Sequence, residues 1–507
     1  MFKKVLIANR GEIALRIMRA AKELKIPVAT IYSDADEEAL HVILSPESYN
    51  IGGTTPAESY LNIEKIIETA KKAGADAIHP GYGFLSENGK FAKACEENGI
   101  TFIGPSPESM EVMGDKLRSR EIAKRAGVPI IPGTEKPISS LKEAKEMAKK
   151  IGYPIMLKAS AGGGGRGMRL VFKEEDLKSS FESAKREAGG AFGDDRIYIE
   201  KYLEEPHHIE IQIVADKHGN TFHLFERECS VQRRHQKVIE ESPSPFIDDR
   251  LRLEIATNGI KIAKEVGYFN AGTVEFLVDK YKNFYFLEMN TRLQVEHPVT
   301  ELVTGKDIVK AQFKIAAGEK LDWKQSEIKQ NGHAIEARIY AEDVLNNFNP
   351  SPGKIIGLIN PSNPGTRIDT GVYQGFTIPI YYDSMIAKLL SYGKTREEAI
   401  ERMLVALNEY RLAGVKNNIV FHQVVINSEI FRKGIYDTNF LNNYDYKSEI
   451  EKIREKNLKN IILSGALIYK NMEKKISFEE KNRKSGSTWK ISGKIESIYK
   501  NSFRLLY

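Results

Sequence analysis

Carboxylates and an amide gather in the stretch from Phe284 to Val299, which reads FYFLEMNTRLQVEHPV. Glu288 and Asn290 follow alternating aromatic residues, and this pattern predicts that both side chains leave one face of a strand. Glu275 lies earlier, in AGTVEFLV, which has the composition of a second strand. Two carboxylates and an amide on neighbouring strands suit Mg²⁺, which accepts few protein ligands and leaves room for phosphate oxygens. The stretch therefore predicts a metal site for phosphoryl transfer, with Mn²⁺ as an alternative ion.

Three further residues continue the alternation, and we expect Arg292, Gln294 and Glu296 on one strand face, with His297 on the opposite face. A guanidinium has the fork geometry that suits a planar oxyanion. Glu296 lies near cations, is therefore ionised at neutral pH, and is our candidate for the general base. An isolated E-x-N pattern would indicate only a salt-bridged amphipathic strand, but the density of polar groups here favours a site.

Composition narrows the class of protein. The chain has 507 residues, enough for two to four domains. No apolar run reaches the length of a membrane span, and the N-terminus has the pattern of a buried strand entering a helix rather than a signal peptide. The two cysteines, Cys95 and Cys229, form no disulfide framework or CxxC pattern, which favours the cytoplasm.

The net charge of +6 is concentrated in one part of the chain. Residues 447–507 contain 15 Lys and Arg against 7 Asp and Glu, a net of +8, which leaves a net of −2 for the first 446 residues. A nucleic-acid footprint requires basic residues clustered on the folded body. We therefore expect no nucleic-acid partner.

Strand and helix patterns alternate over residues 1–114, which predicts an open parallel α/β sheet. No GxGxxG occurs at the first turn, so a dinucleotide fingerprint is missing. A helix predicted over Leu141 to Ile151 precedes the strand PIMLKAS and the run Gly162–Gly167. This run indicates a loop that closes over phosphate or, alternatively, a flexible linker. Lys158 on the strand's end favours the phosphate loop, because a linker needs no fixed cation.

Five motifs together resemble the biotin carboxylase family, which belongs to the ATP-grasp superfamily. They are EMNTRLQVEHPVTE, HPGYGFLSEN, MGDK, KASAGGGGRGM and ERECSVQRRHQKVIEE, and the resemblance runs from Lys4 to about Asn443. It implies an α/β fold: an N-terminal Rossmann-like domain at 1–114, an ATP-grasp domain at 115–330 with a small hinged lid at 132–202, and a catalytic α+β C-terminal domain at 331–446. The basic tail at 447–507 lies outside it.

The resemblance also implies nucleotide contacts. Lys116 and Lys158 would contact ATP phosphates, which the backbone of Gly163, Gly164 and Gly165 would cover. The remaining nucleotide contacts implied are Glu200, Lys201, Tyr202 and Leu203 at adenine, His208 at the ribose side, and Gln232 and His235 near the nucleotide. From the residues alone, 200–203 would be a strand edge, Lys116 a surface lysine and His208 a structural histidine. We interpret Cys229 as a packing residue.

Bicarbonate and biotin contacts follow from the same resemblance. Lys237, Arg292, Gln294 and Val295 would bind bicarbonate. Arg338, in HAIEARIYAED, would bind the biotin ureido oxygen and stabilise the enolate that forms during carboxyl transfer. From the residues alone, Arg338 would be a structural arginine paired with Glu336 or Glu342.

The resemblance implies ATP- and bicarbonate-dependent carboxylation of biotin through carboxyphosphate. The usual biotin attachment motif, a lysine flanked by methionines, is absent, so a separate biotin carboxyl carrier protein or biotinylated carboxyltransferase subunit is the expected partner. A homodimer is also expected, with Arg19 and Glu23 at its interface. The length of the tail favours the stand-alone biotin carboxylase subunit of a pyruvate carboxylase. Alternatives are the corresponding subunit of an acetyl-CoA or acyl-CoA carboxylase, another ATP-grasp carboxylate ligase, and an inactive ATP-binding scaffold.

Overall fold

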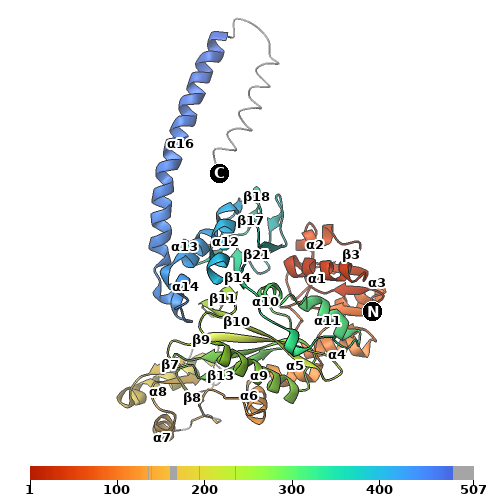
Figure 1. Ribbon diagram of the computed structural model, residues 1–507, viewed down its shortest axis with the longest axis vertical. Helices are drawn as coiled ribbons and strands as arrows, with labels where there is room; N and C mark the ends of the chain where they lie inside the picture. Colours follow the sequence, from red (N-terminus) through yellow and green to blue (C-terminus); the bar gives the residue numbers. More distant parts are fainter. Residues whose placement is uncertain (135, 139, 160–167, 193–194, 235, 483–507) are drawn as a thin grey trace. The chain divides into compact units, whose positions relative to one another are not determined.

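The computed structural model describes residues 1–134, 136–138, 140–159, 168–192, 195–234 and 236–482 (Figure 1). The chain forms two compact units, a body from Met1 to Tyr444 and a tail from Asp445 to Tyr507. The candidate site lies in the body.

The body begins with a five-stranded parallel sheet in the order β3-β2-β1-β4-β5. Its strands are β1 (Val5–Ile7), β2 (Val28–Tyr32), β3 (Ser48–Asn50), β4 (Ala77–His79) and β5 (Thr101–Phe102). The central strand reads VLI and is buried throughout, as expected where helices cover both faces of a parallel sheet. The helices between the strands are α1 (Gly11–Glu23), α2 (Leu40–Ile43), α3 (Ile63–Ala73) and α4 (Gly89–Glu97). The predicted parallel sheet is confirmed.

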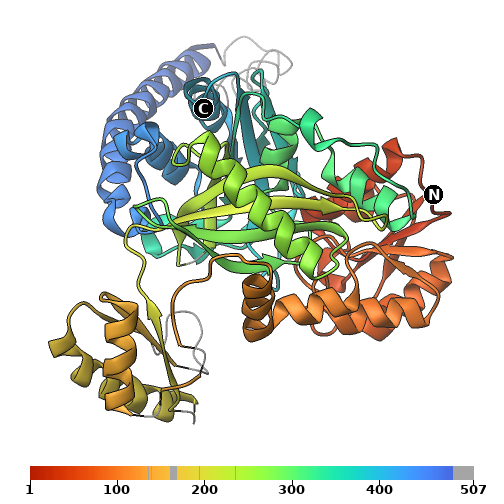
Figure 2. The same cartoon turned by 60° about the horizontal axis from the view of Figure 1, so that its bottom comes forward.

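A smaller antiparallel sheet, in the order β7-β6-β8, follows the connecting helices. The connecting helices are α5 (Pro107–Gly114) and α6 (Lys116–Arg125), which pack against β13 (Phe284–Asn290) of the large sheet. The elements of the small unit are α7 (Leu141–Ile151), β6 (Ile155–Ala159), β7 (Met168–Val171), α8 (Glu174–Phe192) and β8 (Ile197–Lys201). Helix α7 has the predicted bounds, because Ser140 caps its first turn and Gly152 ends it at positive φ. The small sheet and the helices α7 and α8 share a separate core, which includes Leu157, Phe181 and Ile199. Figure 2 shows this small unit projecting from the larger sheet.

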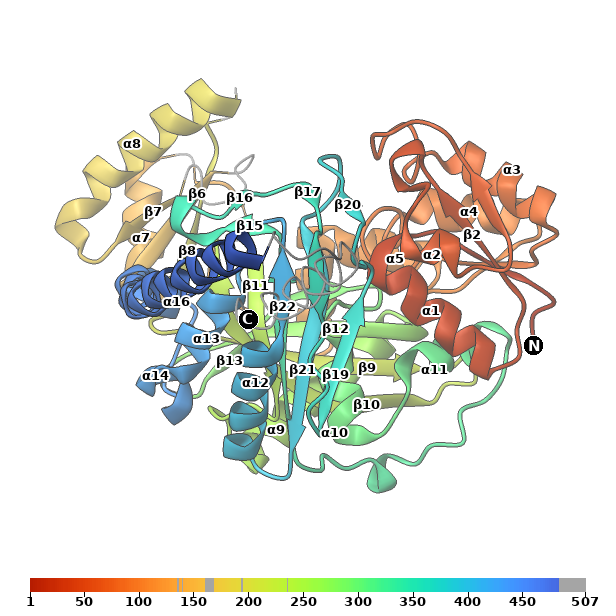
Figure 3. The same ribbon diagram turned by 90° about the horizontal axis from the view of Figure 1, so that it is seen from above.

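An eight-stranded antiparallel sheet, in the order β13-β12-β9-β10-β11-β14-β21-β19, is the centre of the body. Its strands are β9 (His207–Ala215), β10 (Thr221–Arg233), β11 (Gln236–Ser242), β12 (Asn270–Val278), β13 (Phe284–Asn290), β14 (His333–Tyr340), β19 (Thr366–Thr370) and β21 (Met385–Gly393). Helix α9 (Asp249–Glu265) packs on β9 and β10. Strand β11 pairs with β14, so one sheet runs across the predicted boundary at residue 330 (Figure 1). Figure 3 shows β19 and β21, which follow that boundary, from above.

The remaining elements are mostly short. The helices are α10 (His297–Thr304), α11 (Ile308–Ala316), α12 (Arg396–Glu409), α13 (Ile419–Asn427), α14 (Glu429–Lys433) and α15 (Phe440–Asn443). The strands are β15 (Glu342–Asp343), β16 (Asn349–Pro350), β17 (Gly353–Lys354), β18 (Gly357–Ile359), β20 (Thr377–Ile378) and β22 (Arg411–Ala413).

In the tail, the structure describes one long helix, α16 (Tyr446–Asn482), on which Leu458, Ile462 and Leu467 are exposed. Within the part of the chain that the structure describes, no helix is both long enough and apolar enough to cross a membrane.

Candidate functional site

Three glutamates lie directly opposite one another across three strands of the large sheet. Glu275 on β12 is the register partner of Glu210 on β9 and of Glu288 on β13. Opposed residues of an antiparallel pair share a face, and like charges in such positions destabilise a sheet. The row of carboxylates therefore requires cations.

One of these cations is Lys237, on β11. Its ammonium lies 2.8 Å from both Glu275 Oε1 and Glu296 Oε1, and it also forms an ion pair with Glu210. Burial alone would lower the pKa of this lysine, but the three carboxylates hold its pKa well above the usual value. Lys237 is therefore a fixed positive charge at the centre of the carboxylate row.

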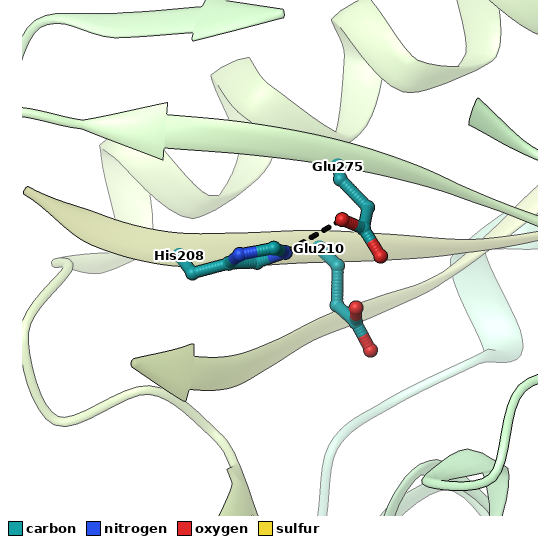
Figure 4. A group of neighbouring side chains, drawn as sticks. All are labelled: His208, Glu210 and Glu275. Carbon is teal, nitrogen blue, oxygen red and sulfur yellow. Dashed lines mark ion pairs between the residues drawn. The ribbon is translucent and has the colours of Figure 1, made fainter. Parts of the chain in front are cut away.

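A histidine approaches the row from strand β9 (Figure 4). Nε2 of His208 lies 2.8 Å from Glu275, and Nδ1 lies 3.0 Å from the Gln232 amide. Burial opposes protonation of His208, but the charge of Glu275 raises the pKa of the imidazole above its usual value. His208, Glu210 and Glu275 bring one ligand atom each within 4.8 Å of one another, so this corner has the donors that a cation needs.

The predicted metal ligands Glu275, Glu288 and Asn290 come together as two carboxylates and an amide. Asn290 donates from Nδ2 to Glu275 Oε1 at 2.7 Å and accepts from Arg292 at 3.0 Å. Partial burial, together with the neighbouring charge of Glu275, raises the pKa of Glu288. A divalent cation between the two carboxylates would relieve that repulsion, so these residues fit Mg²⁺.

Residues 291–296 are a loop, because β13 ends at Asn290. The prediction that strand alternation continues through Glu296 is therefore wrong. The loop nevertheless brings Arg292, Gln294, Val295 and Glu296 to the same cavity. Glu296 precedes α10, and His297 begins that helix buried, with Nδ1 2.8 Å from the Gln294 carbonyl oxygen.

Glu296 and Arg338 form a direct ion pair. Nη2 of Arg338 lies 2.9 Å from Glu296 Oε2, whereas Glu296 Oε1 faces Lys237. Burial would raise the pKa of Glu296, but Lys237 and Arg338 hold its pKa far below the usual value. The second partner of Arg338 is Glu240, at 2.6 Å, so the pairing of Arg338 with Glu336 or Glu342 that the sequence favoured is wrong.

These side chains line a cavity of about 400 Å³. Its lining residues are His208, Gln232, Gln236, Lys237, Glu275, Leu287, Glu288, Asn290, Arg292, Gln294, Val295, Glu296 and Arg338. A second cavity, of about 540 Å³, is lined by Tyr82, Tyr382 and others, and it shares Gln236, Arg292, Val295 and Arg338 with the first. Two cavities of substrate size therefore meet at one wall.

Among the residues that the structure describes, the other positions predicted to bind the nucleotide do not line this cavity. On the small sheet, Lys158 of β6 forms an ion pair with Glu200 of β8. The ammonium of Lys201 donates to the carbonyl oxygens of Gly152 and Tyr153, both at 2.9 Å. Tyr202 and the buried Leu203 follow Lys201 in the chain. Lys116 is exposed at the first residue of α6. Gly163, Gly164, Gly165 and His235 lie outside the described residues. The roles of all these residues stay predictions.

Glu210, Glu240 and Gln236 were missed by sequence reasoning. Glu210 follows His208 by two positions on a strand, so their shared face was a detectable signal. Glu240 reaches Arg338 only through the pairing of β11 with β14, and no local pattern indicates that contact. Cys229 is buried, and burial raises the pKa of its thiol well above the usual value, in agreement with a packing role.

Comparison with protein families matches three models along the chain. They are described as "Biotin carboxylase, N-terminal domain" at residues 1–110, "Carbamoyl-phosphate synthase L chain, ATP binding domain" at 115–324, and "Biotin carboxylase C-terminal domain" at 336–443. A pyruvate carboxylase subunit of Methanothermobacter thermautotrophicus is 53% identical over 446 residues, 88% of this chain and 90% of that protein. Biotin carboxylase 2 of Bacillus subtilis is 54% identical over 441 residues, 87% of this chain and 99% of that protein.

Among solved structures, the biotin carboxylase domain dimer of Hydrogenobacter thermophilus 2-oxoglutarate carboxylase has a TM-score of 0.80 and 50% identity. The similarity covers 87% of this chain and 97% of that chain, which was crystallised with MgADP, ADP and bicarbonate. These similarities confirm the predicted ATP-grasp fold class.

Proposed function

The chain belongs to the biotin carboxylase family, and we propose that it serves as the biotin carboxylase subunit of a pyruvate carboxylase, where it carboxylates biotin on a separate protein. The chemistry is that of an ATP-dependent ligase. The observation that supports it most directly is the position of Glu296, ionised between Lys237 and Arg338 in a cavity that also contains the Mg²⁺-type ligands.

Glu296 is the general base of the first half-reaction in this proposal. Bicarbonate must lose its proton before its oxygen attacks the γ-phosphorus of ATP, which gives carboxyphosphate and ADP. The low pKa of Glu296 keeps the carboxylate ionised, and Lys237 and Arg292 offer positive charge to the bicarbonate oxygens. Gln294 and the backbone of Val295 complete the bicarbonate contacts.

Glu275, Glu288 and Asn290 would hold Mg²⁺, with Mn²⁺ as an alternative. A cation bound there would supply positive charge beside the phosphoryl group that is transferred. Lys116, Lys158 and the loop of Gly163, Gly164 and Gly165 contact the phosphates of ATP. Residues 200–203 contact adenine, and His208, Gln232 and His235 complete the nucleotide site.

Biotin enters through the second cavity in this proposal, because that cavity meets the first at Arg338. Carboxyphosphate releases CO₂ beside biotin, and the freed phosphate takes the N1′ proton. Arg338 stabilises the negative charge on the ureido oxygen, as an oxyanion-hole donor does, while N1′ attacks CO₂. The biotin is carried by a biotin carboxyl carrier protein or a biotinylated carboxyltransferase subunit.

The similarity to the pyruvate carboxylase subunit of Methanothermobacter supports the choice of partner. Biotin carboxylase 2 of B. subtilis, whose name specifies no carboxyl acceptor, is equally similar, so the similarities do not single out pyruvate. An acetyl-CoA or acyl-CoA carboxylase is the second candidate for the parent complex. Purification of the native protein should recover a biotinylated partner that transfers carboxyl to pyruvate. A partner that carboxylates acetyl-CoA or another acyl-CoA instead would favour the second candidate.

We also propose a homodimer, by analogy with the dimeric Hydrogenobacter structure. Arg19 and Glu23 are exposed on α1, as an interface position requires. The reaction itself is tested by measuring ATP cleavage with and without bicarbonate, and then with free biotin. Cleavage that depends on another carboxylate substrate would indicate a different ATP-grasp ligase, and no cleavage would indicate an inactive scaffold.

A further inference from the structure

Arg227, in strand β10, is completely buried directly behind the candidate site. Its guanidinium donates to five side chains: Glu210, Gln212, Thr273, Gln294 and Thr300. It is absent from the lining of both cavities described above, so it has no contact with their contents. Any effect of Arg227 on the reaction must therefore pass through its partners.

A buried guanidinium without water is tolerated only when its donors are satisfied. Burial would lower the pKa of Arg227, but the charges of Glu210 and Glu296 hold its pKa above the usual value. Thr273 on β12 and Thr300 on α10 accept hydrogen bonds of 3.2 and 2.9 Å from it. The guanidinium thus joins two strands and a helix in one fixed arrangement.

The orientation of Gln294 follows from this contact. Its Oε1 accepts from Arg227, so its Nε2 must face the opposite way, where it donates to Glu275 at 2.8 Å and to Glu210 at 3.3 Å. A flipped amide would place its NH₂ group against the guanidinium donors, which offer no acceptor. Arg227 therefore determines which end of Gln294 lies beside the carboxylates.

Glu210 is the second link to the cavity. Its Oε1 faces Arg227 and its Oε2 faces Lys237, so the carboxylate is shared between two cations. Without Arg227, Lys237 would be the only cation in the described part of the chain that is paired with the Glu210 carboxylate. The ammonium would then be drawn toward Glu210 and would have less attraction for an incoming anion.

We propose that Arg227 is a positioning residue for bicarbonate: by holding Gln294 and Glu210, it sets the orientation of the amide and the availability of Lys237. This inference rests on the proposed function, because Gln294 and Lys237 are the bicarbonate contacts there. It assigns no contact between Arg227 and substrate.

The first test is Arg227→Lys, which keeps the charge but loses the fork that reaches several partners at once. The KM for bicarbonate in ATP cleavage should rise about tenfold, as expected if bicarbonate loses one charge-assisted hydrogen bond to its own contacts, Lys237 or Gln294. The KM for ATP should change less than twofold. Equal changes in both KM values, or none in a folded variant, would overturn the proposal.

A second variant covers the case in which Arg227→Lys fails to fold. Thr300→Val removes one acceptor from Arg227 at nearly constant volume, and Thr300 is absent from the lining of both cavities. We expect a two- to fivefold higher KM for bicarbonate and an unchanged KM for ATP. An unchanged KM for bicarbonate here would be sufficient to reject the proposal.

A double-mutant cycle shows whether the effect passes through Gln294. If it does, Arg227→Lys should add little to the bicarbonate KM of Gln294→Ala, whereas independent sites would give multiplied effects. Multiplied effects would contradict the route through Gln294.

Arg396→Lys is the matched control. Arg396 binds buried Glu241 with two hydrogen bonds of 2.7 and 2.9 Å, and neither residue lines the cavity. This variant should lower the thermal midpoint and leave both KM values unchanged. Wild-type protein without bicarbonate-dependent ATP cleavage would instead reject the proposed function, which separates the two failures.

Discussion

Arg338 holds Glu240 at 2.6 Å and so shares its guanidinium between that buried carboxylate and Glu296. Glu240 lies on β11 and Arg338 on the paired strand β14. Burial raises the pKa of Glu240 to about 7, although Arg338 opposes the shift. Arg338 is therefore fixed from behind by Glu240, with its other end at the junction of the two cavities.

Replacement of Glu296 or Arg338 should separate the two half-reactions. Glu296→Ala should abolish both bicarbonate-dependent ATP cleavage and carboxybiotin formation, because the proton acceptor is lost. Arg338→Gln should depress carboxybiotin formation about a hundredfold, the cost of about 3 kcal/mol for one oxyanion partner, and ATP cleavage much less. The measurement is ADP release against acid-labile ¹⁴C fixed on biotin. Equal losses of both signals in Arg338→Gln would mean that Arg338 is structural.

Glu288→Gln should weaken Mg²⁺ binding, because it removes one of the two carboxylates at the predicted ion. ATP turnover at limiting Mg²⁺ should fall about 10- to 100-fold and recover in part at high Mg²⁺. Circular dichroism checks that the fold persists, and Glu254→Gln, on an exposed face of α9, is the control. Normal turnover at limiting Mg²⁺ would contradict the metal assignment.

Lys158→Gln should raise the KM for ATP about tenfold, because one charge-assisted contact to phosphate is lost. The KM for bicarbonate should stay near its wild-type value. Lys149→Gln, exposed on α7 of the same part of the chain, controls for the loss of a surface charge. A shift in bicarbonate saturation instead would show that the nucleotide role is misplaced.

His79 should make stability depend on pH. Burial, followed by the charge of Arg16, lowers the pKa of this imidazole to about 3 in the folded state. In the unfolded chain His79 takes up its proton near pH 6.5. The contribution of His79 to the free energy of unfolding is therefore complete above that pH and declines as the pH falls below it. At pH 5.5 the free energy of unfolding should be lower by about 1.4 kcal/mol. His79→Asn retains an acceptor for the Gly81 amide and should show a shallower decline in urea midpoint between pH 7.5 and 5.5. Parallel declines would contradict this.

Local patterns were sufficient for part of the site. The alternation that places Glu288 and Asn290 on one face depends only on neighbouring residues, and so does the strand around Glu275. The same applies to helix α7, whose start and end are determined by Ser140 and Gly152.

Contacts between distant segments could not be predicted in this way. Glu240 and Arg338 are 98 positions apart, and Arg227 and Gln294 are 67 apart. Their meeting depends on strand register and on a loop conformation, neither of which leaves a periodic signal in one sequence. The loop after Asn290 also changes which side chains face together, so alternation places Arg292 and Glu296 correctly in the cavity but for the wrong reason.

The wall of Gln236, Arg292, Val295 and Arg338 between the two cavities has a consequence for inhibition. A single small molecule that passes this wall would occupy both cavities at once, and thus the pockets proposed for the two half-reactions. Its two halves would gain affinity from being joined, because the second half binds at the high effective concentration that a short linker provides. Such a compound should compete with bicarbonate and with biotin simultaneously, whereas either half alone should compete with only one.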